Sequence, residues 1–210
     1  MDIFETIETR HSVRKYRTDI PPLEDIEKII NAARVAPSST NNQMWHYKVI
    51  YNTDIKNKIK QAVINMYDEI LSWKESEGKE NKINFYKRCA TFFTDAPVNI
   101  AVLMEPRISV MEEVLIAKGL ENSEISRMRP DSGLLSIGAS IENLLLAANA
   151  MGYGACWLTA PLYAYKQLEE ILEVKHPFQL VSFICIGKPE TPDIATVAKK
   201  QLSEIMTIIK

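Results

Sequence analysis

Hydrophobic residues recur every three or four positions along several stretches of the chain, which is the spacing of one face of an α-helix. The pattern predicts helices at about residues 2–9, 23–34, 54–73, 85–93, 132–151 and 165–172. The stretch 132–151 gives the strongest signal, because apolar residues cover most of its circumference and Gly152 follows as a C-terminal cap. We therefore expect this helix to be central and buried.

Shorter apolar runs have the length and composition of β-strands. They lie at residues 45–50, 98–104, 153–158 and 180–186. Long helices separate these runs, which predicts a layered α+β or α/β protein with helices covering a sheet. The pairing of the strands stays open. The segment 106–130 mixes apolar and charged residues, and we interpret it as a helix plus a cover over a site.

The composition is that of an ordinary globular protein, with 46% hydrophobic and 25% charged residues among 210. This length suits one domain, residues 1–210. The formal net charge of -2 argues against a general nucleic-acid binder. No apolar run approaches the roughly 18 residues of a membrane span, and the first residues lack the pattern of a secretory signal. We expect a cytoplasmic protein with neither nucleic acid nor a membrane as partner.

The residues that most often bind metals are scattered. Cys89, Cys156 and Cys185 are far apart and form no Cys-x-x-Cys pair, which predicts reduced thiols. His11 and His46 have no third ligand nearby in the sequence. The sequence therefore predicts no metal site.

A basic segment follows the first predicted helix. Arg10, Ser12 and Arg14 alternate, so in an extended chain their side chains share one side. Two guanidinium groups and a hydroxyl on one side suit the oxygens of a phosphate. The alternative is a basic, solvated surface segment.

Two other polar stretches allow two interpretations each. Residues 36–43, Ala-Pro-Ser-Ser-Thr-Asn-Asn-Gln, form either a turn or a neutral cluster that contacts the edge of a heteroaromatic ring. The pair Lys199 and Lys200 is either a solvated helix start or a further anion contact.

Four motifs in order resemble the FMN-dependent nitroreductase family. They are Arg-x-Ser-x-Arg at 10–14, Pro-Ser-Ser-x-Asn-x-Gln-x-Trp at 37–45, Gly-x-Gly-x-x-Trp at 152–157, and Gly-x-Pro at 187–189 with the basic pair downstream. The resemblance spans nearly the whole chain. It implies an α+β fold with a mixed, mainly antiparallel sheet flanked by helices. It also implies an intertwined homodimer with FMN at the subunit interface.

The resemblance also assigns cofactor contacts. The basic segment and the late lysines match contacts to the phosphate and ribityl chain, and the loop at 37–43, usually from the partner subunit, lies along the flavin. The backbone at 158–160 lies beside the isoalloxazine, with the Thr159 N–H near flavin N5. The full set is Arg10, His11, Ser12, Arg14, Pro37, Ser38, Ser39, Asn41, Gln43, Leu158, Thr159, Ala160, Lys199 and Lys200.

The activity implied by the resemblance is a ping-pong oxidoreduction. NADH or NADPH gives a hydride to flavin N5, and a nitroaromatic, quinone or related acceptor then takes the electrons, so no catalytic side chain is needed. The alternatives are a non-catalytic FMN carrier or redox sensor, a flavin-dependent dehalogenase or an oxygen-using, flavin-fragmenting enzyme on the same fold, and a structural protein without a cofactor. Met44 and Lys188 stand where the family commonly has Pro and an aromatic residue, which limits any transfer of substrate preference.

Overall fold

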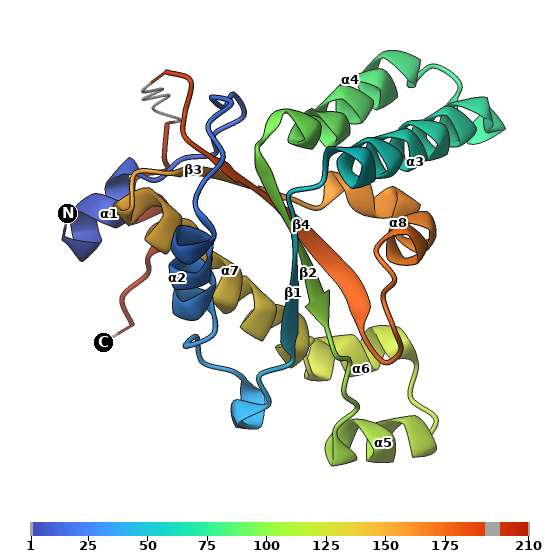
Figure 1. The fold of residues 1–210 in the computed structure, drawn as a ribbon. Helices are drawn as coiled ribbons and strands as arrows, with labels where there is room; N and C mark the ends of the chain where they lie inside the picture. The colour runs from blue at the N-terminus through green and yellow to red at the C-terminus, as the bar shows by residue number, and fades with distance from the viewer. Residues whose placement is uncertain (1, 192–197, 210) are drawn as a thin grey trace.

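The computed structural model describes residues 2–191 and 198–209, and its centre is a four-stranded antiparallel sheet (Figure 1). The strands are β1 (Trp45–Ile50), β2 (Val98–Met104), β3 (Gly154–Leu158) and β4 (Gln179–Gly187), in the order β1-β2-β4-β3. All four predicted strands are confirmed. An isolated parallel bridge joins Ser12 to Ala155 at the edge strand β3, so the sheet is antiparallel apart from this one contact.

Helices cover both faces of this sheet (Figure 1). On one face lie α2 and α7, with α1 beside α7, and on the other lie α3, α4 and α8. The bounds of the helices are α1 (Ile3–Thr9), α2 (Leu23–Ala33), α3 (Thr53–Ser72), α4 (Glu80–Thr91), α5 (Val110–Ala117), α6 (Asn122–Met128), α7 (Ser132–Ala150), α8 (Tyr165–Ile171) and α9 (Leu202–Ile205).

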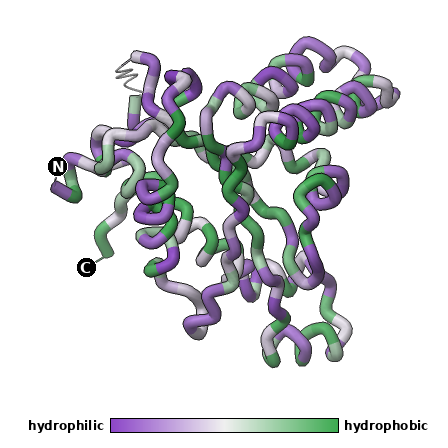
Figure 2. Tube along the Cα trace, in the orientation of Figure 1, coloured by the Kyte–Doolittle hydropathy of each residue, from purple (hydrophilic) through white to green (hydrophobic). Residues whose placement is uncertain are grey.

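The sheet separates two hydrophobic cores, because successive side chains of a strand point to opposite faces. In β2, Ile100 and Val102 pack on the α2 and α7 side, whereas Ala101 and Leu103 pack on the other side. Every residue of β2 is buried, which explains its continuous apolar sequence. Figure 2 shows hydrophobic residues along the central strands and hydrophilic ones along the outer helices.

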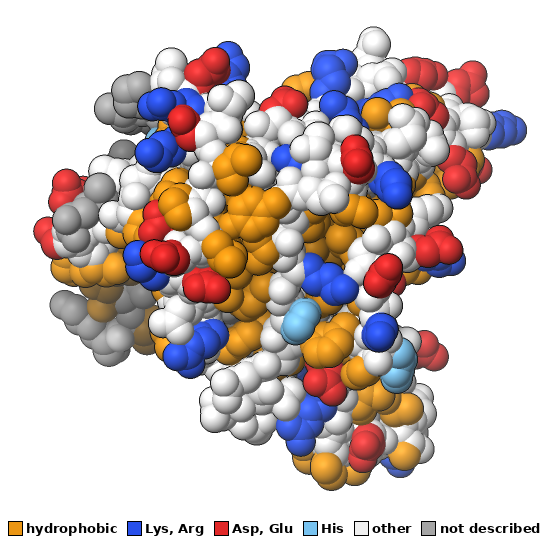
Figure 3. All heavy atoms as spheres, viewed as in Figure 1, with side chains coloured by type: hydrophobic (Ala, Val, Ile, Leu, Met, Phe, Trp, Pro, Cys, Tyr) orange, Lys and Arg blue, Asp and Glu red, His pale blue; other side chains and the backbone are white. Residues whose placement is uncertain are grey.

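The edge strand β1 is less protected than the central strands. Its residues Trp45, Tyr47 and Val49 are only half-buried. Figure 3 shows hydrophobic side chains gathered in the middle of the face where β1 lies, with charged side chains around them. This edge of the sheet therefore presents apolar surface in the single chain.

Helix α7 is central, as predicted, but it is not buried all round. Ser140 donates a hydrogen bond to the Ala33 carbonyl oxygen of α2 at 2.8 Å. The α7 side chains Ile137, Ile141 and Leu144 are buried on the sheet side, whereas Leu134 and Leu135 are exposed. Length and composition alone would allow α7 to cross a membrane, but here it packs as a core helix with one apolar stripe left open.

The apolar residues of α1 (Ile3, Phe4 and Ile7) are exposed in the single chain. Two predicted helices need correction. Helix α4 begins at Glu80 rather than at 85, because the charged residues form its outer face while Ile83 packs against the core. The helix predicted at 54–73 ends at Ser72, and Trp73 beyond it is 48% exposed.

Candidate functional site

The basic segment lies extended against the edge strand β3. The Val13 N–H donates to the Ala155 carbonyl oxygen at 3.0 Å, next to the bridge between Ser12 and Ala155. Val13 is buried, whereas Ser12 and Arg14 on the other side of the extended chain are exposed. The alternation predicted from the sequence is therefore present, and Val13 anchors it.

The charges of this segment are only partly compensated. Arg10 Nε lies 3.3 Å from Glu142 Oε1 of α7. Arg14 donates one long hydrogen bond, 3.4 Å to the Ser12 carbonyl oxygen, and has no acidic partner among residues 2–191 and 198–209. His11 Nδ1 lies 3.0 Å from the Thr9 carbonyl oxygen, while its buried Nε2 has no protein partner in the described part of the chain. An uncompensated guanidinium and an unpaired ring nitrogen fit a phosphate ligand.

The segment 158–160 follows directly from the same strand. Leu158 ends β3, and Thr159 precedes a short 3-10 helix, η4 (Ala160–Ala164). Ser182 donates to the Leu158 carbonyl oxygen at 3.1 Å and Tyr67 donates to that of Ala160 at 3.3 Å, so neighbouring elements fix this backbone. A strand rises about 3.3 Å per residue, so Leu158 lies roughly 10 Å along β3 from Ala155 and the basic segment.

The third predicted group, the loop 37–43, lies elsewhere. It contains η1 (Ser39–Asn41), and the Ser39 N–H donates to Ser136 Oγ near the start of α7 at 3.2 Å. The basic segment instead follows α1, which packs near the other end of α7, where Asn149 donates to the Thr6 carbonyl oxygen at 3.0 Å, and Arg10 of the segment reaches Glu142 in the middle of α7. The loop leads into β1 whereas the basic segment is bridged to β3, so the two lie at opposite edges of the sheet, with β2 and β4 between them. One chain does not bring this loop to its own basic segment.

The backbone of the loop is unusual. Thr40, Asn41 and Gln43 have φ values of 53°, 54° and 47°, a left-handed conformation that costs free energy in residues other than glycine. The Gln43 N–H donates to Ser38 Oγ at 3.0 Å, which holds the loop in this form. Lys199 and Lys200, the last predicted contacts, are exposed and form no ion pair within the part of the chain that the structure describes.

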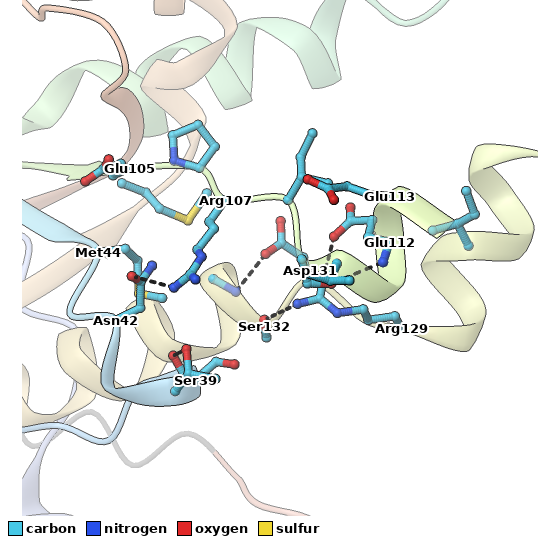
Figure 4. Close-up of a pocket in the computed structure, with 18 of the residues that line it drawn as sticks. Ser39, Asn42, Met44, Glu105, Arg107, Glu112, Glu113, Arg129, Asp131 and Ser132 are labelled. Carbon is cyan, nitrogen blue, oxygen red and sulfur yellow. Dashed lines mark hydrogen bonds and ion pairs between the residues drawn. The ribbon is translucent and has the colours of Figure 1, made fainter. Parts of the chain in front are cut away.

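A cavity of about 650 Å³ lies beside the loop 37–43 (Figure 4). The start of α7, the end of β2 and the two short helices α5 and α6 form its other walls. Arg107 donates to Asn42 Oδ1 at 3.1 Å, and Arg129 donates to Glu112 Oε2 at 2.6 Å and to Ser132 Oγ at 3.1 Å. The segment 106–130 contains two helices, α5 and α6, rather than one, and both form walls of this cavity, whereas its role as a cover over a functional site stays a prediction. Sequence reasoning missed Arg107 and Arg129, although charged residues are dense at 105–113 and again at 121–131.

Arg129 joins α5 and α6 to the start of α7, so its replacement should loosen this segment. Arg129→Met should lower the local opening free energy of residues 107–130 by about 1–2 kcal/mol, because two hydrogen bonds from a charged, half-buried guanidinium are lost. Hydrogen exchange measured by mass spectrometry would detect faster exchange there. Arg127→Met, on the exposed side of α6, is the matched control. Equal exchange in both variants would contradict the role of Arg129.

The antiparallel sheet between two helical layers, with an extended segment bridged to its edge strand, defines an α+β protein of the nitroreductase-like fold. The chain belongs to the nitroreductase family, whose sequence model matches residues 7–188. The predicted fold class and family are thereby confirmed.

Individual relatives agree with this assignment. A BluB-like flavoprotein from Clostridium difficile 630 is 32% identical, with a TM-score of 0.89 and full coverage of both chains. A protein from Methanothermobacter thermautotrophicus, named for NADH dehydrogenase and NAD(P)H nitroreductase, is 28% identical over 75% of this chain, and the chain spans 60% of that relative's length. A nitroreductase from Bacteroides fragilis, crystallised with bound FMN, shares the fold with a TM-score of 0.69 at 18% identity, covering 100% of both chains.

Proposed function

We propose that this protein is an FMN-dependent oxidoreductase that uses NADH or NADPH to reduce nitroaromatics, quinones or related acceptors. The observation that carries the proposal is the arrangement along β3. A basic segment whose Arg14 has no acidic partner among the described residues lies beside Ala155, and a fixed backbone loop lies at the end of the same strand. Family membership and the FMN bound to a solved member of the fold support the choice of cofactor.

Different residues of this chain would bind different parts of the cofactor. Arg14, Ser12 and His11 would hold the phosphate, and the N–H of Thr159 would orient the ring. Bound FMN would supply the redox chemistry, by exchanging a hydride at N5. The positive charge of Arg10 and Arg14 would also stabilise the anionic reduced form of the cofactor. No side-chain nucleophile or metal ligand is part of this proposal.

The site we propose is completed by a second copy of the chain. The loop 37–43 lies too far from its own basic segment, so the loop of the partner subunit would cover the cofactor. Exposed apolar residues on α1 and at Leu134 and Leu135 of α7 support a homodimer, because large apolar surfaces usually mark interfaces. Size-exclusion chromatography with light scattering would give a monomer mass if this arrangement is wrong.

The proposed cofactor and activity can be tested together with one absorbance experiment. The purified protein, reconstituted with FMN if needed, should show flavin bands that bleach when NADH or NADPH is added without oxygen. An acceptor such as 1,4-naphthoquinone should then restore the bands. Bands that persist with both nucleotides would favour a carrier or redox sensor, and a protein that does not retain FMN would overturn the proposal.

A further inference from the structure

A second hollow, of about 440 Å³, lies next to the segment 158–160. Aromatic side chains from three elements surround it: Tyr67 of α3, Tyr86 of α4 and Tyr163 of η4. The remaining lining residues are Thr159, Ala160 and Leu162, so within the described part of the chain no charged side chain lines the hollow. It differs in this respect from the cavity of Figure 4, which carries both acidic and basic groups.

Tyr67 forms the fixed floor of the hollow. It is 2% exposed, and its hydroxyl donates to the carbonyl oxygen of Ala160. Its ring meets that of Tyr163 edge to face, with centroids 5.6 Å apart. Burial is the main cause that raises the pKa of Tyr67 to about 12, so the hydroxyl stays protonated and keeps this hydrogen bond at neutral pH.

Tyr163 and Tyr86 form the open walls. They are 62% and 45% exposed, and among the described residues their hydroxyl groups have no hydrogen-bond partner. Aromatic faces attract other aromatic rings, and a free phenolic hydroxyl donates to a carbonyl or nitro oxygen. The walls therefore offer ring contacts and hydrogen bonds, and the charge nearest to them is that of Lys82, whose Nζ lies 5.9 Å from the centroid of the Tyr86 ring.

We propose that this hollow binds the neutral, planar aromatic acceptor, and that Tyr86 and Tyr163 determine the preference for it. The inference rests on the proposed function, because it requires the cofactor ring to lie at Thr159. For a quinone, the reaction converts quinone, NAD(P)H and one proton into hydroquinone and NAD(P)+, with two electrons transferred. An anionic inorganic oxidant would gain nothing from the tyrosine rings.

The test compares an aromatic with a non-aromatic acceptor. Tyr86→Ala and Tyr163→Ala should each raise the KM for 1,4-naphthoquinone about 10-fold, because each loses a ring contact. The KM for ferricyanide should stay unchanged. Tyr165→Ala is the matched control, since this residue is an exposed aromatic next to the lining residues but outside the hollow, and should leave both KM values unchanged.

Measurement of FMN affinity separates this inference from the proposed function. The dissociation constant for FMN should change less than twofold in the tyrosine variants. If FMN affinity falls about 10-fold instead, the tyrosines hold the cofactor ring and the inference is wrong. Equal KM values for naphthoquinone in all variants would also overturn it, while FMN binding and bleaching by NAD(P)H would leave the proposed function intact.

Discussion

Replacing Arg14 with alanine should weaken FMN binding by roughly 10- to 100-fold. A hydrogen bond to a charged group contributes about 1.5–3 kcal/mol, and each 1.4 kcal/mol changes an affinity tenfold. Arg14 is the most effective position, because its guanidinium has no acidic partner among the described residues, whereas that of Arg10 is shared with Glu142. Titration of apoprotein with FMN, followed by quenching of flavin fluorescence, measures the effect.

The neighbouring residue provides the control. Lys15 is exposed and follows Arg14 directly, but in an extended chain it points to the opposite side. Lys15→Ala removes the same formal charge. It should change FMN affinity less than threefold at physiological salt, since interactions between exposed charges are largely screened beyond about 8 Å. Equal losses in the two variants would mean that only the net charge matters, and that Arg14 makes no specific contact.

Replacing Gly154 with alanine should destabilise the protein and weaken FMN binding together. A Cβ at this position would lie 2.6–2.8 Å from the three branched carbon atoms of Val13. Val13 joins the basic segment to β3, so the clash pushes that segment off the strand. Overpacking of this kind costs about 1–3 kcal/mol. Urea unfolding measures the stability, and the FMN titration measures the site.

A double-mutant cycle makes the assignment specific. In a Val13→Gly background all three clashing atoms are gone, so adding Gly154→Ala should cost almost nothing further. The coupling free energy should therefore be about as large as the cost of Gly154→Ala alone. If Gly154→Ala is equally costly in both backgrounds, the penalty arises from the strand itself and not from contact with the basic segment.

The sequence alone determined the four strands, most of the helices and the extended form of the basic segment. Period-2 alternation at 10–14 correctly predicted an extended segment with Ser12 and Arg14 on one side, because backbone geometry forces alternate side chains to share a side. The four strands and the start of α7 were equally local features. Asp131 caps that helix through the N–H groups of Gly133 and Leu134, as its position in the sequence allows.

Only the tertiary structure decided which of these pieces meet. Gly154 permits close approach of Val13, and this contact between residues far apart in sequence sets the basic segment on β3. The same structure leaves the loop 37–43 near Ser136 and gathers Tyr67, Tyr86 and Tyr163 around one hollow. Such groupings depend on helix packing and strand order, which arise from many weak contacts across the chain and leave no periodic pattern in it.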